Sequence, residues 1–264
     1  MKSVVFVHAH PDDEALLSGG TLRALHQKGF RTVVIFLTNG ERGLSQGIKS
    51  ETLGDVRQKE ATQSATILGV SKTFFLGYTD SGLDSPSGLV EHSLIPLDEA
   101  LSRVKAIVEE EKPVLLVGYD SEGGYGHPDH KTVHHIVRHL GSIQDIPSIL
   151  EVTVDRAVIA STLERFRYLI SLLEKFNIVK AQNIYDLANR FSATADISYV
   201  VNVKKFSSAK QSALKAHLSQ TLGGIRNLRV MTMLPHVIFK HFFGTEWFTV
   251  IRESDDNPIK ALTS

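Results

Sequence analysis

Short apolar runs alternate along this chain with longer segments in which apolar residues recur at helical spacing. The runs are rich in β-branched residues and contain almost no polar residue, which predicts strands with both faces covered. They occupy residues 4–7, 32–37, 73–76 and 114–117. The segments between them predict helices over residues 13–28, 55–68 and 97–111, with Gly29 and Gly69 as C-terminal stops.

The order of these elements predicts the fold class. Strand followed by helix, repeated, indicates an α/β fold: a Rossmann-like, doubly wound, mostly parallel sheet flanked by helices. Beyond residue 141 the pattern is less regular, and the expected elements are strands over 152–160 and 199–203 and helices over 163–176 and 206–218.

No linker-like segment divides the chain, so we predict one domain over residues 1–264. Within it, about residues 142–254 form a less regular C-terminal extension that contributes to a pocket or an interface. Residues 255–264 are predicted to form a flexible tail.

Composition excludes several classes of protein. The chain has 29 basic and 29 acidic side chains, so no global charge favours nucleic acid or an anionic membrane. It has no cysteine, which excludes disulfides, thiolate metal ligands and a cysteine nucleophile. The N-terminal apolar run is too short for a signal peptide or a membrane span, so we expect a cytoplasmic protein without a transmembrane segment.

Two polar motifs follow predicted strands and share the order His-Pro-Asp. Residues 10–14 (HPDDE) follow the first strand, and residues 126–130 (GHPDH) follow the strand that ends near Val117. Ligands of doubly wound sheets bind beyond the carboxyl ends of the strands, so we expect the two loops to meet at one crevice. Either motif alone is more often a helix cap or a turn, but their joint occurrence favours a catalytic metal site.

Histidine and aspartate in these motifs form a plausible ligand set for a catalytic zinc ion. Such a site takes about three protein ligands and keeps a position for water, whose pKa the metal lowers to about 7. We predict His10, Asp13 and His130 as the ligands. The same donors tolerate another divalent metal such as Fe²⁺.

The remaining polar residues of the motifs predict the acid–base chemistry. Asp12 is the predicted general base, because neighbouring aspartates in a turn diverge and one of them faces the substrate. His127 is predicted to stabilise the oxyanion or to protonate the leaving group. Asp129 is predicted to hold the His127 ring and to raise its basicity.

Both motifs are similar to those of the PIG-L (LmbE-like) family of zinc-dependent N-acetylglucosaminyl deacetylases, without departures from the family pattern. The resemblance covers most of the chain and agrees with the ligand and base roles given above. It implies hydrolysis of a linear amide bond, with removal of the acetyl group from N-acetylglucosamine attached to another group. The expected partner is therefore a small amino-sugar conjugate and not nucleic acid. Assembly of the chain into a homo-oligomer is an open alternative.

Weaker features extend the resemblance. It implies that Arg57 and Asp80 hydrogen-bond sugar hydroxyls and that Tyr125 assists at the oxyanion. From the residues alone, Arg57 is equally typical of a solvent-facing helix position and Asp80 of a turn. Residues 210–220 match the family's helix of the form K-x-x-A-x-x-x-H-x-S-Q, but apolar neighbours favour core packing for its histidine, His217, which is not predicted to be a site residue.

Three other functions remain as alternatives. A related amidase would cleave another acyl amide or a thiol conjugate with the same metal centre. A non-catalytic sugar-binding protein would keep the pocket, although binding alone needs no general base such as Asp12. A nucleotide-binding module is disfavoured, because neither G-x-G-x-x-G nor G-x-x-x-x-G-K-[ST] occurs in the chain.

Overall fold

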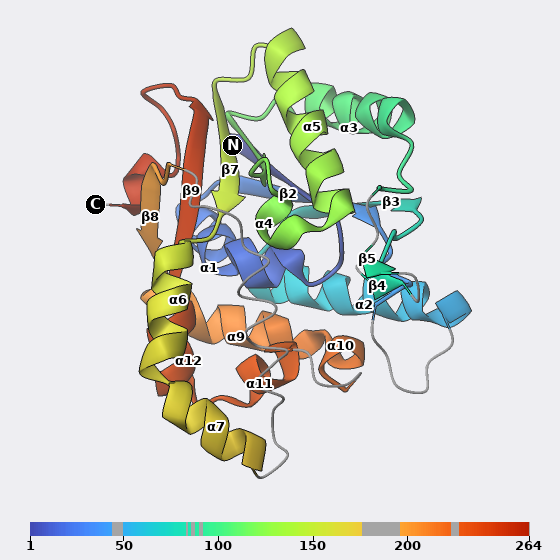
Figure 1. Cartoon of the computed structure of the whole chain (residues 1–264). Helices are drawn as coiled ribbons and strands as arrows, with labels where there is room; N and C mark the ends of the chain where they lie inside the picture. Colours follow the sequence, from blue (N-terminus) through green and yellow to red (C-terminus); the bar gives the residue numbers. More distant parts are fainter. Residues whose placement is uncertain are drawn as a thin grey trace.

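A seven-stranded sheet forms the centre of the protein (Figure 1). The computed structural model describes residues 1–43, 50–82, 84–85, 88–89, 92–175, 196–222 and 227–263. In spatial order, the strands of the sheet are β3 (Lys72–Tyr78), β2 (Arg31–Thr38), β1 (Ser3–His8), β6 (Leu115–Tyr119), β7 (Ser148–Thr153), β9 (Thr245–Arg252) and β8 (Tyr199–Asn202). A separate small hairpin consists of β4 (Asp84–Ser85) and β5 (Gly88–Leu89).

Helices cover the two faces of the sheet. In the described ranges they are α1 (Asp13–Gln27), α2 (Ser50–Leu68), α3 (Leu97–Glu111), α4 (Gly123–Gly126), α5 (Pro128–Ile143), α6 (Arg156–Arg165), α7 (Arg167–Lys175), α9 (Ser207–Ala216), α10 (Leu218–Leu222), α11 (Asn227–Met233) and α12 (His236–Phe243). Helices α1, α2 and α9 contact one another, and α3 contacts α5. Among the helices of the described part, none combines the length and the apolar character needed to cross a membrane.

The strand order reverses between β1 and β6. Strand β1 pairs in parallel with β2 on one side and with β6 on the other. The chain therefore runs outward from β1 to β3 and then returns to the opposite side of β1. The loops that follow β1 and β6 leave the same edge of the sheet next to each other, which brings residues 10–14 and 126–130 together, as the sequence predicts.

The predicted N-terminal elements are confirmed. Every residue of β1 and all but the first residue of β2 are buried, as expected for strands covered on both faces. Gly29 and Gly69 follow the ends of α1 and α2 with φ of 82° and 79°, a left-handed conformation that stops a helix at little cost for glycine. Helix α2 begins earlier than predicted, at Ser50.

The C-terminal part departs from the predicted order. The strand predicted over residues 152–160 is wrong beyond Thr153, because β7 covers Ser148–Thr153 and α6 begins at Arg156. The Asp155 carboxylate accepts a hydrogen bond from the backbone N–H of Val158 at 3.1 Å, so an N-cap outweighs the β-branched composition. The predicted helix over residues 163–176 is divided between α6 and α7, and residue 176 lies outside the described residues.

The sheet is mixed at one edge, where β9 pairs antiparallel with both β7 and β8. Strand β9 is not among the predicted strands, because it lacks the continuous buried run of the central parallel strands and alternates between half-buried and buried positions only in its first half. The sheet as a whole is therefore mostly parallel, with an antiparallel edge formed by the C-terminal extension.

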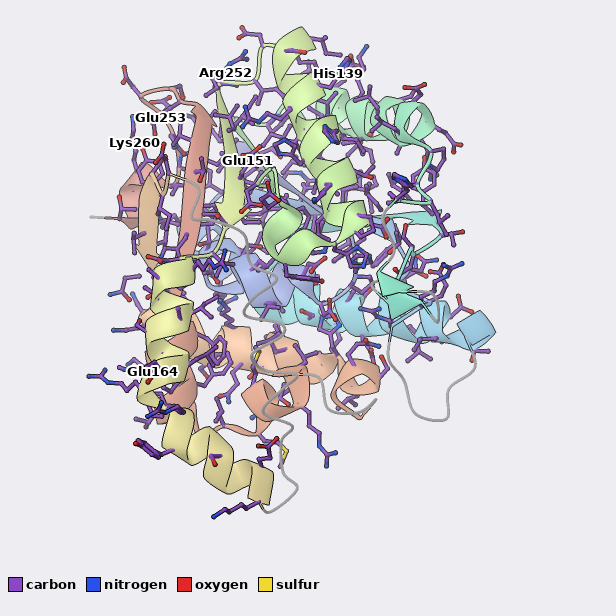
Figure 2. The ribbon with its side chains drawn as sticks, viewed as in Figure 1. His139, Glu151, Glu164, Arg252, Glu253 and Lys260 are labelled. Carbon is purple, nitrogen blue, oxygen red and sulfur yellow. The ribbon has the colours of Figure 1, made fainter. Side chains whose placement is uncertain are left out.

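The segment predicted as a flexible tail makes contacts with this edge. Asn257 and Ile259 are buried, and the Asn257 amide donates to the Glu253 carboxylate at 2.8 Å. Lys260 lies 3.6 Å from Glu253 (Figure 2). A short 3-10 turn, Lys260–Leu262, contacts β8. These contacts distinguish residues 257–262 from an unattached terminus.

A buried ion pair joins the C-terminal extension to α1. Lys210 on α9 donates to Glu246 on β9 at 2.6 Å, and both side chains are at most 2% exposed. The Glu246 carboxylate also accepts hydrogen bonds from the backbone N–H groups of Gly20 and Thr21 at 2.9 and 2.8 Å. Removing one partner would leave the other charge buried and only partly compensated.

We expect Lys210→Met to lower the free energy of unfolding by about 3 kcal/mol, the lower end of the usual cost of breaking a buried pair, since two N–H groups still serve Glu246. The matched control is Lys72→Met, which removes a 38% exposed partner of Glu110 and should cost less than about 1 kcal/mol. Urea unfolding of both variants measures the difference. Equal losses would contradict a structural role for the buried pair.

Candidate metal centre

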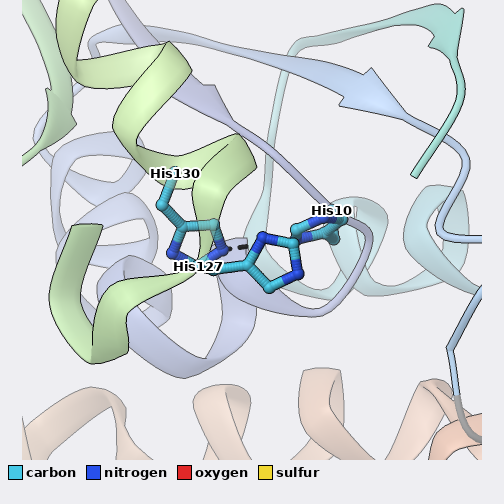
Figure 3. A group of neighbouring side chains, drawn as sticks. All are labelled: His10, His127 and His130. Carbon is cyan, nitrogen blue, oxygen red and sulfur yellow. Dashed lines mark hydrogen bonds between the residues drawn. The ribbon is translucent and has the colours of Figure 1, made fainter. Parts of the chain in front are cut away.

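Three histidines meet beyond the carboxyl ends of β1 and β6 (Figure 3). His10 lies in the loop between β1 and α1, whereas His127 and His130 lie at the start of α5. The ring centroid of His10 is 4.3 Å from that of His127 and 5.2 Å from that of His130. All three side chains are buried. The two sequence motifs thus form one site.

A glycine-rich turn before α5 makes room for His130. Gly123 has φ of 61°, and a Cβ atom there would lie 2.7 Å from the Cβ atom of His130, closer than real contacts. The Asp120 carboxylate fixes this turn by accepting hydrogen bonds from the backbone N–H of Gly124 at 2.9 Å and from the Thr153 hydroxyl at 2.7 Å. A side chain at position 123 would displace His130.

Side-chain atoms of the three predicted ligands form a nearly regular triangle. His10 Nδ1 lies 3.2 Å from His130 Nε2, and Asp13 Oδ2 lies 3.3 Å from His130 Nε2 and 3.5 Å from His10 Nδ1. A tetrahedral zinc ion with bonds of about 2.0–2.2 Å to nitrogen and oxygen separates its ligand atoms by roughly 3.3 Å. The spacing therefore fits one small divalent cation.

Hydrogen bonds on the outer side of the imidazoles indicate which nitrogens carry protons. His130 Nδ1 lies 3.1 Å from the carbonyl oxygen of Gly123, and His10 Nε2 lies 3.1 Å from the Asp129 carboxylate. Both of these partners are acceptors, so the outer nitrogens donate. In neutral rings the facing nitrogens then both present lone pairs, the arrangement that metal-binding histidines require. These lone pairs repel each other and the Asp13 oxygen unless a positive charge lies between them.

The pKa values of the cluster reflect the same demand for positive charge. Burial acts to lower the pKa of His10, but the Asp80, Asp129 and Asp13 carboxylates outweigh it and raise that pKa well above its usual range. Burial acts to raise the pKa of Asp13, but the charges and hydrogen bonds of His130 and His10 hold it well below its usual range. The surroundings of the cluster therefore favour positive charge at this position.

Asp12 lies outside the triangle, at the start of α1, in an unusual backbone conformation with φ of 109°. Its Oδ2 accepts a hydrogen bond from Arg57 at 3.0 Å, and Arg57 also donates to the carbonyls of Pro11 and, at 2.6 Å, Gly40. Oδ1 makes no hydrogen bond to any residue that the structure describes, and the side chain is 23% exposed. Burial raises the pKa of Asp12 despite the charge of Arg57, which favours a proton acceptor.

His127 caps α5 with its ring. The backbone N–H of Asp129 donates to His127 Nδ1 at 3.2 Å, so the proton of the neutral ring is on Nε2. Burial, together with the charges of His10 and His130, lowers the pKa of His127 to about 2. One ring nitrogen of His127 lies within 4.8 Å of ligand nitrogens of both other histidines. His127 thus offers a neutral N–H donor near the cluster.

The Asp129 carboxylate contacts His10, in contrast to the predicted contact with His127. Its Oδ2 lies 3.1 Å from His10 Nε2 but 3.9 Å from His127 Nδ1. The carboxylate also accepts hydrogen bonds from the backbone N–H of Ser81 at 2.9 Å, from the Ser81 hydroxyl and from the Ser93 hydroxyl at 2.5 Å. Ser81 follows β3 and Ser93 precedes α3, and together they turn the carboxylate toward His10, so Asp129 orients a predicted ligand.

The predicted substrate-binding residues border the cluster. Asp80 lies 3.5 Å from His10 Nε2 and accepts a hydrogen bond from the backbone N–H of Gly82. The Tyr125 ring lies edge-on to that of His130, with centroids 5.0 Å apart. Arg57 is only 3% exposed, so it is not solvent-facing, and its Nε has no partner in the described part of the chain. Contacts of these three residues with a sugar stay predictions.

Several residues around the site are missing from the sequence prediction. The Tyr119 hydroxyl donates to Asp13 Oδ2 at 2.7 Å, and Glu14 accepts a hydrogen bond from the backbone N–H of Asp12 at 2.9 Å. His217 lies 2.8 Å from Glu14 and is fully buried. Their positions in the sequence could have indicated them. Tyr119 ends a strand that leads to the site, Glu14 is the last residue of the motif at residues 10–14, and His217 belongs to the motif at residues 210–220.

A separate cavity of about 260 Å³ lies between α6, α12 and β9. Its lining includes Phe166, Phe242 and Trp247 but no residue of the metal cluster. The C-terminal extension therefore forms a pocket of its own, while its contribution to a substrate pocket stays a prediction.

The fold is similar to that of solved enzymes with different reactions. An N,N'-diacetylchitobiose deacetylase from Pyrococcus horikoshii aligns with a TM-score of 0.59 and 21% identity, over 95% of this chain and 84% of that chain. A 4-carboxy-2-hydroxymuconate hydratase from Pseudomonas putida aligns with a TM-score of 0.57 and 15% identity, over 96% and 98%. These likenesses show the fold alone.

Sequence comparison is more specific. A 1D-myo-inositol 2-acetamido-2-deoxy-alpha-D-glucopyranoside deacetylase of Rhodococcus erythropolis is 30% identical and aligns with 83% of this chain and 81% of its own. The enzyme of that name from Streptomyces scabiei is 27% identical over 94% of this chain and 84% of its own. The family profile described as PIG-L, GlcNAc-PI de-N-acetylase, matches residues 5–140, which is more than half of the chain and includes both motifs. The chain therefore belongs to the PIG-L family.

Proposed function

We propose that this protein removes the N-acetyl group from an N-acetylglucosamine-type sugar conjugate, with a divalent metal ion held by His10, Asp13 and His130. The observation that carries the proposal is the triangle of three donor atoms beside Asp12, whose second carboxylate oxygen has no partner among the described residues. A site that only binds sugar needs no such base. The relatives named as deacetylases of an acetamido sugar joined to inositol support this substrate class.

The residues of the site suggest how the amide is cleaved. A divalent ion bound here would polarise the acetyl carbonyl and lower the pKa of the attacking water. Asp12 accepts a proton from that water while the water oxygen bonds to the acetyl carbon. His127 donates its Nε2–H to the carbonyl oxygen as negative charge develops there, because the Asp129 backbone already occupies Nδ1.

The second half of the reaction breaks the carbon–nitrogen bond and releases acetate and the amine. The departing nitrogen needs a proton, which either Asp12 or His127 can supply. We favour Asp12, because it holds the proton taken from water, whereas the lowered pKa of His127 keeps that ring neutral. Tyr125 would assist at the oxyanion, and Asp80 and Arg57 would bind sugar hydroxyls, as the family resemblance implies.

Several finer properties belong to this proposal. Zinc is the proposed metal, with Fe²⁺ as the alternative, because histidine and carboxylate ligands accept both. One domain over residues 1–264 is supported by the buried contact between Glu246 and α1. A cytoplasmic location and a homo-oligomeric state stay predictions. A small-molecule substrate is consistent with the balanced charge of the chain.

Amine release by the purified protein tests the proposed function. The substrates are N-acetylglucosamine and its inositol, malate and disaccharide conjugates, each assayed after chelation and after stoichiometric zinc or Fe²⁺ is restored. We expect metal-dependent release from at least one conjugate. Free zinc is removed first, because a solved structure of similar fold is described as a zinc-inhibited teicoplanin deacetylase.

The same assay separates the alternatives. Amides with longer acyl groups and amides of thiol conjugates are included, and release from these alone would indicate the related amidase. Stoichiometric metal without release from any amide would contradict the proposed function and favour a sugar-binding protein.

Asp12 and Asp13 should differ in what they contribute. We expect Asp12→Ala to keep its bound metal and to lose activity by roughly 10²- to 10⁴-fold, the usual contribution of a general base. Asp13→Ala should lose metal as well, because it removes one corner of the triangle. Elemental analysis and turnover of both purified variants measure this. Equal metal loss in the two variants would refute the division of roles.

His127→Ala should keep its metal and lower kcat by roughly 10²- to 10³-fold, as expected when one oxyanion donor is removed. The structure also places His127 close enough to His10 and His130 to be a ligand itself. Metal content decides between the two roles. Metal loss as complete as in Asp13→Ala would assign His127 to the ligand set.

A further inference from the structure

A buried carboxylate, Glu14, connects three helices directly behind Asp12. Its Oε1 lies 2.8 Å from His217 Nε2, at the end of α9, and accepts a hydrogen bond from the Ser64 hydroxyl of α2 at 2.5 Å. Its Oε2 accepts a hydrogen bond from the backbone N–H of Asp12 at 2.9 Å. His217 is therefore linked to the backbone of the proposed base through one side chain.

The backbone of Asp12 needs an external restraint. Its φ of 109° and ψ of −26° are unfavourable for a residue with a side chain, by an amount on the order of 1–3 kcal/mol, and persist only where the surroundings enforce them. Glu14 holds the N–H of Asp12, and Arg57 holds the carbonyl of Pro11 and the Asp12 carboxylate. Loss of the Glu14 contact would let φ relax and move the carboxylate away from its position beside the metal triangle.

Glu14 can act as this restraint only if its own carboxylate is fixed. His217 and Ser64 both bind Oε1, which leaves Oε2 for Asp12. The His217 ring is fully buried, and its Nδ1 has no hydrogen-bond partner among the described residues. Such an unpartnered nitrogen is unfavourable, so an apolar side chain would serve packing better. What the histidine adds is the contact through Nε2.

We infer that His217 is a positioning residue for the proposed general base: it fixes Glu14, and Glu14 holds Asp12 in its left-handed conformation. This inference rests on the proposed function, in which Asp12 accepts the proton. Burial acts to lower the pKa of His217, but the charge and hydrogen bond of Glu14 raise it, which favours a charged pair. His217 acts through Glu14, and its hydrogen bonds in the described part include none to a predicted metal ligand.

Two chemically matched variants test this inference. His217→Gln places its amide nitrogen as many bonds from the backbone as Nε2, so it keeps a donor for Glu14, whereas His217→Asn reproduces only the Nδ1 position. We expect His217→Gln to retain kcat within about threefold. His217→Asn should lower kcat by roughly 10- to 100-fold, the range expected for a misplaced catalytic group, with KM and metal content nearly unchanged.

Lys210→Met is the structural control. Lys210 lies on the same helix and is equally buried, but its partner is Glu246. This variant should lose stability and keep the kcat of the folded enzyme.

Equal kcat for His217→Gln and His217→Asn, or a loss expressed in KM alone, would overturn the positioning role. If His217→Asn does not fold, Glu14→Met replaces it, since a thioether of similar length removes the carboxylate that accepts from the Asp12 N–H; it should show the same loss of kcat with metal retained.

A second readout does not depend on activity. Hydrogen exchange of the Asp12 amide, followed by NMR in the metal-free protein, should be at least tenfold faster in His217→Asn than in His217→Gln or the unaltered protein. Unchanged exchange in His217→Asn would refute the link. If the unaltered protein cleaves no amide, the proposed function fails, while this exchange experiment still decides whether His217 fixes Asp12.

Discussion

Repulsion between three electron-rich atoms is the constraint on which this structure depends. Nitrogens of His10 and His130 and an oxygen of Asp13 lie 3.2–3.5 Å apart, and the outer hydrogen bonds turn lone pairs toward one another. When both rings are neutral this arrangement is unfavourable, because the lone pairs of two imidazoles face each other and a buried carboxylate with no positive charge between them. The raised pKa of His10 reflects the same need for positive charge. A divalent cation would convert the same contacts into coordination bonds, and this is the reason for proposing a metal ion here.

The rest of the chain supplies the rigidity that such a site needs. The reversal of strand order brings the loops after β1 and β6 together, and Tyr119, Asp129 and the Gly123 carbonyl fix the three ligands from outside. The C-terminal extension holds α1 at two points, through Glu246 at the middle of the helix and through His217 behind its first turn. The C-terminal extension, whose sequence pattern is the least regular, therefore helps to position the motif at residues 10–14.

The sequence predicts the parallel half of the fold and the metal cluster, because both depend on local patterns. Buried β-branched runs identify β1 and β2, and the shared His-Pro-Asp order identifies the two loops. Partners that come from distant elements leave no local pattern. Asp129 contacts His10 because Ser81, after β3, and Ser93, before α3, donate hydrogen bonds to it. The apolar neighbours of His217 conceal its contact with Glu14. The antiparallel strand β9 lacks the continuous buried run that identifies β1 and β2, and its pairing with β7 and β8 defines it.

The fold is shared by a deacetylase and a hydratase, so the chemistry has to be argued from the ligand triangle and Asp12. Anomalous diffraction at the zinc edge, from crystals of the protein with stoichiometric zinc, tests that argument most directly. We expect one ion about 2 Å from His10 Nδ1, His130 Nε2 and an Asp13 carboxylate oxygen. An ion bound by Asp80 or Asp129 in place of Asp13, or no ion in this cluster, would contradict it.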